Sequence, residues 1–235
     1  MKSQLIILGC GSSIGVPRID GFWGSCKKSE IKNKRSRCSA IIIKGSNSVL
    51  IDASPDIKHQ LISNKIKNIK SVLITHEHAD QTNGLFELRP FYWKRGNKKI
   101  NIYGDCQTMK LVKSRQDYLF KKVNTYLPIA KSNTIKSKFT LGTRSEKIYF
   151  DTIKATHGKI NCLIYVYEKI AYISDCNDLS IINIKELKNL KYIILDCLKL
   201  IRHPSHFNLN EALLVHDQLK PKTIISFGSY ASLSP

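Results

Sequence analysis

Short apolar runs recur along the chain, and several of them end in a residue that can carry chemistry. The runs contain four to six β-branched or apolar residues between polar or turn residues, a pattern that predicts buried strands. The predicted strands are Ser48–Ser54 with Asp52, Lys70–His78 with His76, Lys147–Lys159 with His157, Lys169–Asp178 with Asp175, and Lys191–Cys197 with Asp196. If the strand ends gather at one edge of the sheets, these side chains meet there.

Three segments between the apolar runs predict helices. They are residues 54–65, 178–189 and 208–220. Asn208 is placed to cap the last helix, with Glu211 three residues later in the capping-box position. Residues 66–76, 187–197 and 219–229 share a frame of a basic linker, four apolar residues and a polar position. The pattern predicts an α/β fold in which sheet strands alternate with outer helices.

Composition sets the size and the surface charge. The chain has 235 residues, of which 42% are hydrophobic, so we expect one domain over residues 1–235 rather than two small ones. Lys and Arg number 38 against 18 Asp and Glu, which gives 38 − 18 = +20. Such a charge attracts phosphate, nucleic acid or an anionic membrane. Because the lysines are scattered among Ile and Asn, a generic basic surface is favoured over a dedicated nucleic-acid face.

Cysteine usage indicates a reducing compartment. The chain has seven cysteines at irregular spacing and no CxxC pair, which fits reduced thiols better than a disulfide framework. The N-terminal apolar run stops at Gly9 and is too short for a secretion signal. No run approaches the roughly 20 apolar residues of a membrane span. We expect a soluble cytoplasmic protein without membrane association.

The stretch ITHEHADQTNG, residues 74–84, carries His76, His78 and Asp80 at alternate positions. Imidazole and carboxylate groups are the ligands that zinc and similar ions bind. Asp52 on a neighbouring strand is placed to fix the tautomer of a ligand histidine. A single histidine is more often an ordinary polar residue, but this ordered set, followed by a histidine and an aspartate at later strand ends, predicts a metal site.

The ordered set resembles the metallo-β-lactamase-fold hydrolases over nearly the whole chain. The resemblance is closest to the branch of PhnP-like cyclic phosphodiesterases. The supporting stretches are LGCGSSIGVP at 8–17, RCSAIII at 37–43, LIDASPD at 50–56, THEHADQTNGLFELRPF at 75–91, and DCLKLIRHPSHFNLNEAL at 196–213. The resemblance implies a four-layer αββα sandwich with its site at one edge of two sheets. It also implies phosphodiester hydrolysis, with a ribose cyclic phosphate as the best-known substrate.

The resemblance also implies roles for individual residues. His76, His78 and His157 match the ligands of a first metal. Asp80 matches a second-metal ligand that also orients the nucleophile, and Asp175 matches a carboxylate that bridges both ions. A metal-bound hydroxide would attack phosphorus, and His206 would act as the general acid for the leaving oxygen.

Three further residues are candidates for binding the substrate phosphate. They are Arg89, Lys159 and His203, and the alternative for each is an ordinary surface position. That alternative is about as strong as the binding role for Arg89 and Lys159, and slightly stronger for His203. The expected cofactor is a divalent metal, zinc or manganese, as one or two ions.

The sequence departs from the family pattern at the second metal. Gln81 stands where the family has a histidine, and Phe227 stands where a late strand ends in another. A glutamine amide oxygen suits harder ions such as manganese or magnesium, whereas phenylalanine cannot bind a metal. We therefore expect a complete first site, a reduced second site, and a C-terminal tail that is short or altered relative to the family. Cys26 alone, far from Cys10 and Cys38, does not predict a structural zinc.

Three functions remain open from the sequence. The leading hypothesis is a metal-dependent phosphodiesterase for a small substrate. The second is an RNA-processing nuclease of the same fold, disfavoured because no basic arm is inserted to hold transfer RNA. The third is a catalytically impaired descendant that binds a ligand or partner, favoured by Gln81 and Phe227. A homodimer is compatible with each.

Overall fold

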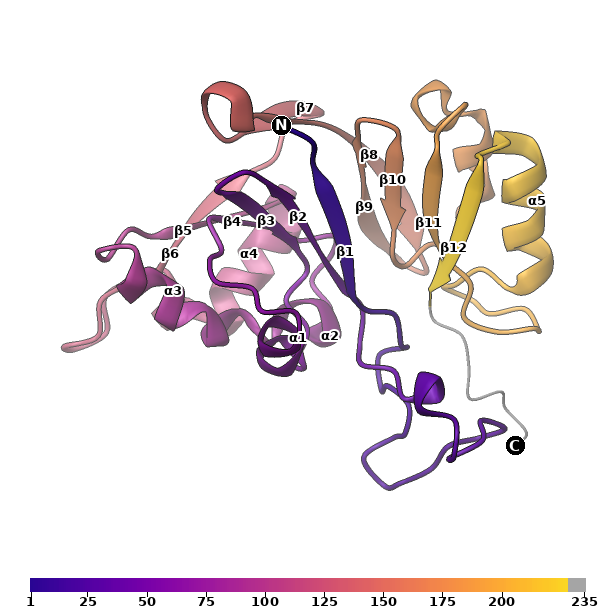
Figure 1. The fold of residues 1–235 in the computed structure, drawn as a ribbon, viewed down its shortest axis with the longest axis horizontal. Coiled ribbons are helices and arrows are strands. Elements are labelled where there is room, and N and C mark those ends of the chain that lie inside the picture. Colours follow the sequence, from indigo (N-terminus) through magenta and orange to yellow (C-terminus); the bar gives the residue numbers. More distant parts are fainter. Residues whose placement is uncertain (228–235) are drawn as a thin grey trace. The chain divides into compact units, whose positions relative to one another are not determined.

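The computed structural model describes residues 1–227 and divides the chain into two compact units (Figure 1). The first unit contains residues 1–8 and 39–148, and the second contains residues 9–38 and the chain from residue 149 onward. Each unit has its own β-sheet and helices, in agreement with the expected α/β class. The expectation of a single domain over residues 1–235 stays a prediction.

The first unit is built on a sheet with strand order β1-β2-β3-β4-β5-β6. Strands β2 and β3 pair antiparallel, and β3 to β6 pair parallel, so that their carboxyl ends lie at one edge. The strands are β1 Gln4–Gly9, β2 Ser39–Lys44, β3 Asn47–Ile51, β4 Ser71–Leu73, β5 Ile100–Gly104 and β6 Ala130–Thr134. Strand β7, Lys138–Leu141, follows in sequence.

Helices connect the strands of this sheet. They are α1 Ile57–Ser63, α2 Ala79–Thr82, α3 Arg89–Lys94 and α4 Cys106–Arg115, with 3₁₀ turns at η2 Leu85–Leu88 and η3 Asp117–Leu119. A further 3₁₀ turn, η4 Arg144–Glu146, follows β7. Ile57, Leu61 and Val112 of these helices share one buried cluster with Leu50 and Val72 of the sheet. Burying each such side chain stabilises the fold by about 1.5–3 kcal/mol. The predicted helix after Asp52 is confirmed by α1.

The loop after β3 is joined by its backbone to the segment that carries the histidines. The Ala53 N–H donates to the carbonyl of Gln81 at 2.8 Å, and the Gly84 N–H donates to the carbonyl of Ala53 at 2.8 Å. A Cβ at Gly84 would lie 2.0 Å from the carbonyl oxygen of Ser54, so only glycine allows this approach. The main chain around α2 is therefore fixed by contacts that do not involve the side chain of Gln81.

The second unit contains a sheet in which β12-β11-β10-β9-β8 are consecutive neighbours. Strands β8, β9 and β10 pair antiparallel, and β10, β11 and β12 pair parallel. The strands are β8 Ile148–His157, β9 Ile160–Tyr167, β10 Ile170–Ile173, β11 Tyr192–Asp196 and β12 Thr223–Phe227. The predicted strands that end near His157, Asp175 and Asp196 are confirmed.

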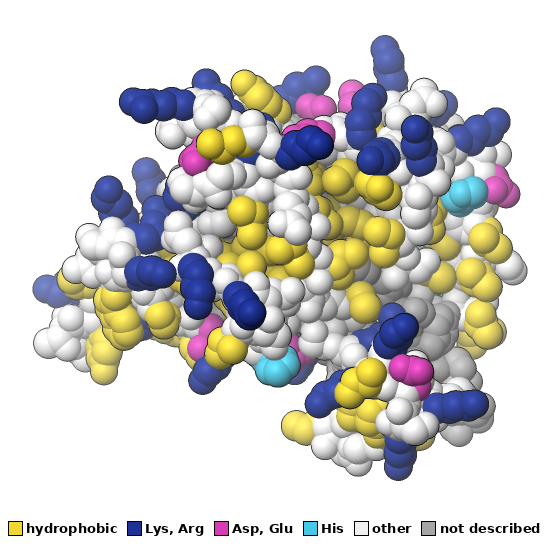
Figure 2. Space-filling model, viewed as in Figure 1, with side chains coloured by type: hydrophobic (Ala, Val, Ile, Leu, Met, Phe, Trp, Pro, Cys, Tyr) yellow, Lys and Arg dark blue, Asp and Glu magenta, His cyan; other side chains and the backbone are white. Residues whose placement is uncertain are grey.

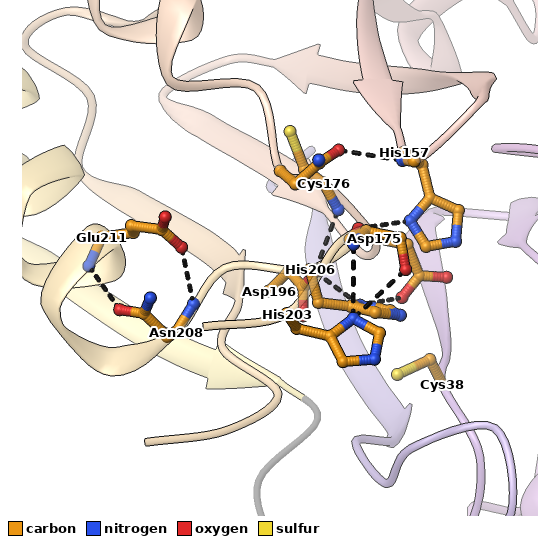
Figure 3. Close-up of polar contacts among 12 residues, drawn as sticks. Cys38, His157, Asp175, Cys176, Asp196, His203, His206, Asn208 and Glu211 are labelled. Atoms are coloured by element: carbon orange, nitrogen blue, oxygen red, sulfur yellow. Dashed lines mark hydrogen bonds and ion pairs between the residues drawn. The ribbon is translucent and has the colours of Figure 1, made fainter. Parts of the chain in front are cut away.

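Helix α5, Leu209–Leu219, begins with the predicted capping box. Asn208 accepts a hydrogen bond from the Glu211 N–H at 3.0 Å, and Glu211 accepts one from the Asn208 N–H at 3.0 Å (Figure 3). Ala212, Val215 and Leu219 on the buried face of α5 share the core of this unit with Ile193 and Leu195 of β11. Figure 1 shows α5 beside the parallel strands.

The predicted helix over 178–189 is wrong. The segment forms two 3₁₀ turns, η5 Leu179–Asn183 and η6 Lys185–Leu187. Another 3₁₀ turn of the second unit, η1 Ile31–Asn33, lies near the N-terminus. β-Branched Ile together with Ser and Asn has low helix propensity, and the Asp178 side chain accepts a hydrogen bond from the Ser180 N–H, which favours a turn. Ile181 and Leu187 still reach the core, so the apolar pattern reflects burial rather than an α-helix.

Two surface properties bear on the binding partners. Lys and Arg side chains are dispersed over the face shown in Figure 2, among fewer Asp and Glu. Across the part of the chain that the structure describes, every helix is too short or too polar to cross a bilayer.

Candidate active site

The first group of candidate residues follows strand β4. His76 is buried and His78, exposed, is the residue immediately before α2. Asp80 lies in the first turn of α2, and the Gln81 side chain beside it is buried and donates a hydrogen bond to Asp80 at 3.2 Å. The ring atoms His76 Nε2 and His78 Nδ1 are 3.0 Å apart, so the HxH spacing does bring two imidazole nitrogens together.

A buried chain of hydrogen bonds sets the tautomer of His76. Asp52 accepts hydrogen bonds from the Thr75 backbone N–H at 2.8 Å and from the Thr75 hydroxyl at 2.9 Å. Because the hydroxyl proton points to Asp52, the Thr75 oxygen accepts the Nδ1–H of His76, 3.0 Å away. The Nε2 atom of His76 is then the unprotonated nitrogen. Thr75 is a link that was not predicted from the sequence.

This geometry fits a divalent cation. A metal ion binds the unprotonated nitrogen of an imidazole whose other nitrogen donates to a neighbouring group. His76 meets this condition, and its Nε2 converges with His78 Nδ1 to a separation compatible with two ligands about 2.0–2.1 Å from one zinc ion.

Asp52 also stabilises the fold. It is fully buried and adopts φ of 58°, a left-handed conformation that Asp and Asn tolerate better than Ala. We expect Asp52→Ala to lower the free energy of unfolding by about 3 kcal/mol, because two donors of Thr75 lose a charged acceptor. Urea denaturation measures the change. Asp52→Asn, which keeps an oxygen acceptor, should cost clearly less, and equal losses in the two variants would contradict this assignment.

The second group lies in the second unit, at the end of β8. His157 is the last residue of this strand, and its Nδ1–H donates to the backbone carbonyl of Ser205 at 2.6 Å (Figure 3). Its Nε2 atom is therefore the nitrogen that can bind a metal, as with His76. His157 is buried, and its ring lies edge-on to the ring of His206 with centroids 4.7 Å apart.

Asp175, Asp196 and His206 form a compact cluster at the ends of β10 and β11. One ligand atom from each lies within 4.8 Å of the others. His206 Nδ1 is 2.7 Å from an oxygen of Asp196 and 3.7 Å from an oxygen of Asp175 (Figure 3). Asp196 is almost completely buried and also accepts the Cys176 backbone N–H at 3.0 Å. Burial raises the pKa of the Asp196 carboxyl, while the backbone N–H donors of Cys176 and Phe207 oppose this shift.

The contact between His206 and Asp196 orients the imidazole ring. With Nδ1–H held by the carboxylate, Nε2 is the ring atom that can exchange a proton with a substrate. Asp196 is predicted from the sequence to end a strand at the edge where the side chains of a metal site gather, but not to orient His206. Its partner lies ten positions away, across an irregular loop whose path the apolar pattern does not determine.

The remaining predicted residues lie in different surroundings. His203 is half-buried, its ring is 5.1 Å from that of His206, and burial, followed by the charges of His206 and Lys199, lowers its pKa. Lys159 is exposed in the turn between β8 and β9. In the first unit, Arg89 begins α3, with its guanidinium 5.9 Å from the ring centre of Tyr126. Phe227 ends β12, and its side chain lies outside the described residues, as do residues 228–235.

Comparison with known proteins identifies the family and the fold. The beta-lactamase superfamily domain matches residues 47–227. A solved diphosphatase of the PhnP family is 26% identical, with a TM-score of 0.83 over 99% of this chain and 88% of that chain. The predicted metallo-β-lactamase fold and the resemblance to the PhnP-like branch are both confirmed.

Curated relatives are longer proteins. An octanoyltransferase of Porphyromonas gingivalis is 28% identical over 227 residues, which cover 94% of this chain and 45% of that protein. A ribonuclease Z of Prochlorococcus marinus is 30% identical over 148 residues, covering 60% of this chain and 44% of that protein. The chain thus spans about half the length of the curated relatives it matches. With most of its length matched by the family's domain, the chain belongs to the beta-lactamase superfamily.

Proposed function

We propose that this chain is a metal-dependent hydrolase that cleaves the phosphodiester bond of a small substrate, with a ribose cyclic phosphate as the leading candidate. The contact of 2.7 Å between His206 and the buried Asp196, beside Asp175, carries the proposal. An imidazole held by a buried carboxylate and lying beside a second carboxylate is the arrangement that a proton donor next to a metal ligand would need. Similarity to a PhnP-family diphosphatase over 99% of the chain supports a phosphorus substrate.

The proposal assigns the metal ligands from the order of the motifs and from the family. His76, His78 and His157 would hold the first divalent ion, and Asp80, Asp175 and Gln81 would contribute to a second. When bound, the metal supplies positive charge that stabilises the negative charge developing on the phosphoryl oxygens. We propose zinc or manganese, because the histidines suit zinc and the amide oxygen of Gln81 suits manganese.

The protein side chains position the reactants and move protons. The Asp80 carboxylate would orient the attacking water molecule by accepting its hydrogen bond and would take up the proton that the water loses as it attacks phosphorus. His206 gives the proton on Nε2 to the leaving alkoxide, and the resulting neutral ring stays in place through Asp196. Arg89, Lys159 and His203 are proposed to bind the non-reacting phosphate oxygens. Asp52 acts through Thr75 on the orientation of His76.

A combined measurement of metal content and turnover tests the proposal. Protein purified without added metal is equilibrated with zinc or manganese, and its hydrolysis of bis(p-nitrophenyl) phosphate and of a ribose cyclic phosphate is measured. We expect at least one ion per chain and turnover that a chelator abolishes. Two ions would show that a second site forms, whereas bound metal without turnover on either ester would favour the impaired ligand-binding descendant.

A second candidate function is RNA processing. The identity of 30% with ribonuclease Z over 148 residues and the net charge of +20 favour it. Binding through phosphate contacts would weaken steeply as salt rises, because each contact releases counterions. Salt-insensitive hydrolysis of the small ester, together with weak binding of a transfer-RNA precursor, would reject this candidate.

We also propose a cytoplasmic location. All seven cysteines are free thiols, four of them buried, which suits a reducing compartment. The location can be tested by labelling the thiols of intact cells with a reagent that does not cross membranes. We expect labelling only after the cells are permeabilised.

A further inference from the structure

Asn177 connects three segments of the second unit. It lies two residues after Asp175, and its backbone N–H donates to the Thr156 carbonyl at 3.0 Å. Its side-chain oxygen accepts the Gly158 N–H at 2.9 Å, and its side-chain nitrogen donates to the Pro204 carbonyl at 2.9 Å. One half-buried carboxamide thus joins the end of β8, the end of β10 and the loop between β11 and α5.

The joined segments carry the residues of the proposed reaction. Thr156 and Gly158 flank His157, and Pro204 lies two residues before His206. The same two segments meet again where His157 donates to the Ser205 carbonyl. Asn177 and His157 therefore form two parallel connections between the turn that holds a metal ligand and the loop that holds the proton donor.

Close packing makes the position of the His157 turn against the His206 loop sensitive to small shifts. Gly158 adopts φ of 61°, and a Cβ on it would lie 2.9 Å from the Cβ of Ser205. The turn and the loop therefore approach each other without an intervening side chain. A small shift of the loop would move the Ser205 carbonyl and the His206 ring together, because the two residues are adjacent.

The chemistry of Asn177 is specific to an amide. The carboxamide offers an acceptor to Gly158 and a donor to Pro204 at the same time. Aspartate would keep the acceptor but place a carboxylate oxygen against the Pro204 carbonyl, and leucine of similar size would lose both bonds. The position thus permits a graded test in which one or both connections are removed.

We propose that Asn177 is a positioning residue that holds the His157 turn and the His206 loop in the register needed for phosphodiester cleavage. The inference rests on the proposed function and adds to it a residue that contacts neither metal nor substrate. Removal of an outer-shell partner of a metal ligand typically costs about 10–100-fold in activity or metal affinity. We expect kcat to fall because the loop that carries His206 shifts, and we expect KM to rise as well, because Lys159 and His203 are the immediate neighbours of Gly158 and Pro204.

The experiment compares Asn177→Asp, Asn177→Leu and the control Asn183→Asp. Asn183 is exposed in η5 of the same unit, so its variant introduces the same charge away from the carboxamide. We expect kcat to fall about tenfold in N177D and about a hundredfold in N177L, and to stay within about twofold in N183D. Thermal unfolding of each variant identifies any loss that comes from unfolded protein.

A second readout is independent of turnover. Long-range ¹H–¹⁵N spectra of the metal-free protein report which ring nitrogen of His157 and His206 carries the proton. In N177L we expect the His157 signals to shift toward a mixture of tautomers, because the Ser205 carbonyl is no longer held. N177D should show a smaller shift in the same direction, and N183D none.

The outcomes separate the inference from the proposed function. A wild-type protein with metal but without turnover would reject the phosphodiesterase, while the ring spectra would still decide whether Asn177 positions His157. Folded N177L and N177D with unshifted histidine signals and wild-type kcat would overturn the positioning role. The positioning role would be established if kcat falls most in N177L, less in N177D and not in N183D, and if the histidine signals shift in the same order.

Discussion

Replacing His206 with glutamine should separate substrates by their leaving groups. General acid catalysis contributes about 10²–10⁴-fold, and it matters only when the leaving oxygen needs a proton. We expect His206→Gln to lower kcat on an alkyl phosphodiester by about this factor. Hydrolysis of bis(p-nitrophenyl) phosphate should fall by less than about tenfold, because p-nitrophenolate leaves without a proton. Parallel steady-state kinetics on the two esters measures the difference.

Two further variants sharpen this prediction. Asp196→Asn should show the same preference for the activated ester in weaker form, because the ring of His206 loses the carboxylate that fixes its Nδ1–H. His216→Gln is the matched control, since His216 lies on α5 with 45% of its side chain exposed. Equal losses on the two esters in His206→Gln would show that this residue acts in binding or folding rather than as the proton donor.

Replacing His76 with alanine should remove the metal and the activity together. His76 is the buried member of the histidine pair, and its tautomer is set through Thr75. Loss of several kcal/mol of charge stabilisation corresponds to a decrease in kcat/KM of about a thousandfold or more. Metal analysis after dialysis and turnover on bis(p-nitrophenyl) phosphate measure the two effects on the same sample.

The control for this variant is His59→Ala, which removes an exposed histidine from α1 of the same unit. It should retain metal and activity. Full metal content in a folded His76→Ala variant would contradict the assignment of His76 as a ligand. Retained activity after complete removal of metal with a chelator would reject metal dependence altogether.

The strand ends were predictable because burial imposes a simple pattern. The apolar runs before Asp52, His157 and Asp196 form the strands β3, β8 and β11, and the polar residues follow directly. Helix α5 was predictable because Asn208 and Glu211 are a local capping signal, three residues apart. Features of this kind depend only on neighbours in the sequence.

The connections between segments were not predictable in the same way. The contact of His206 with Asp196 and the contacts of Asn177 with Pro204 depend on the path of an irregular loop. The role of Thr75 depends on the direction of one hydroxyl proton. The 178–189 segment shows the converse error, because buried isoleucines occur in 3₁₀ turns as well as in helices.

The backbone hydrogen bonds around α2 hold the main chain at residue 81 independently of the side chain at that position. The main chain at residue 81 is fixed through Ala53 and Gly84, whatever side chain residue 81 carries. On the proposed assignment, a change between histidine and glutamine there would alter a metal ligand without a change in the course of the chain. A single substitution at position 81 is therefore expected to change the metal preference while the backbone stays the same.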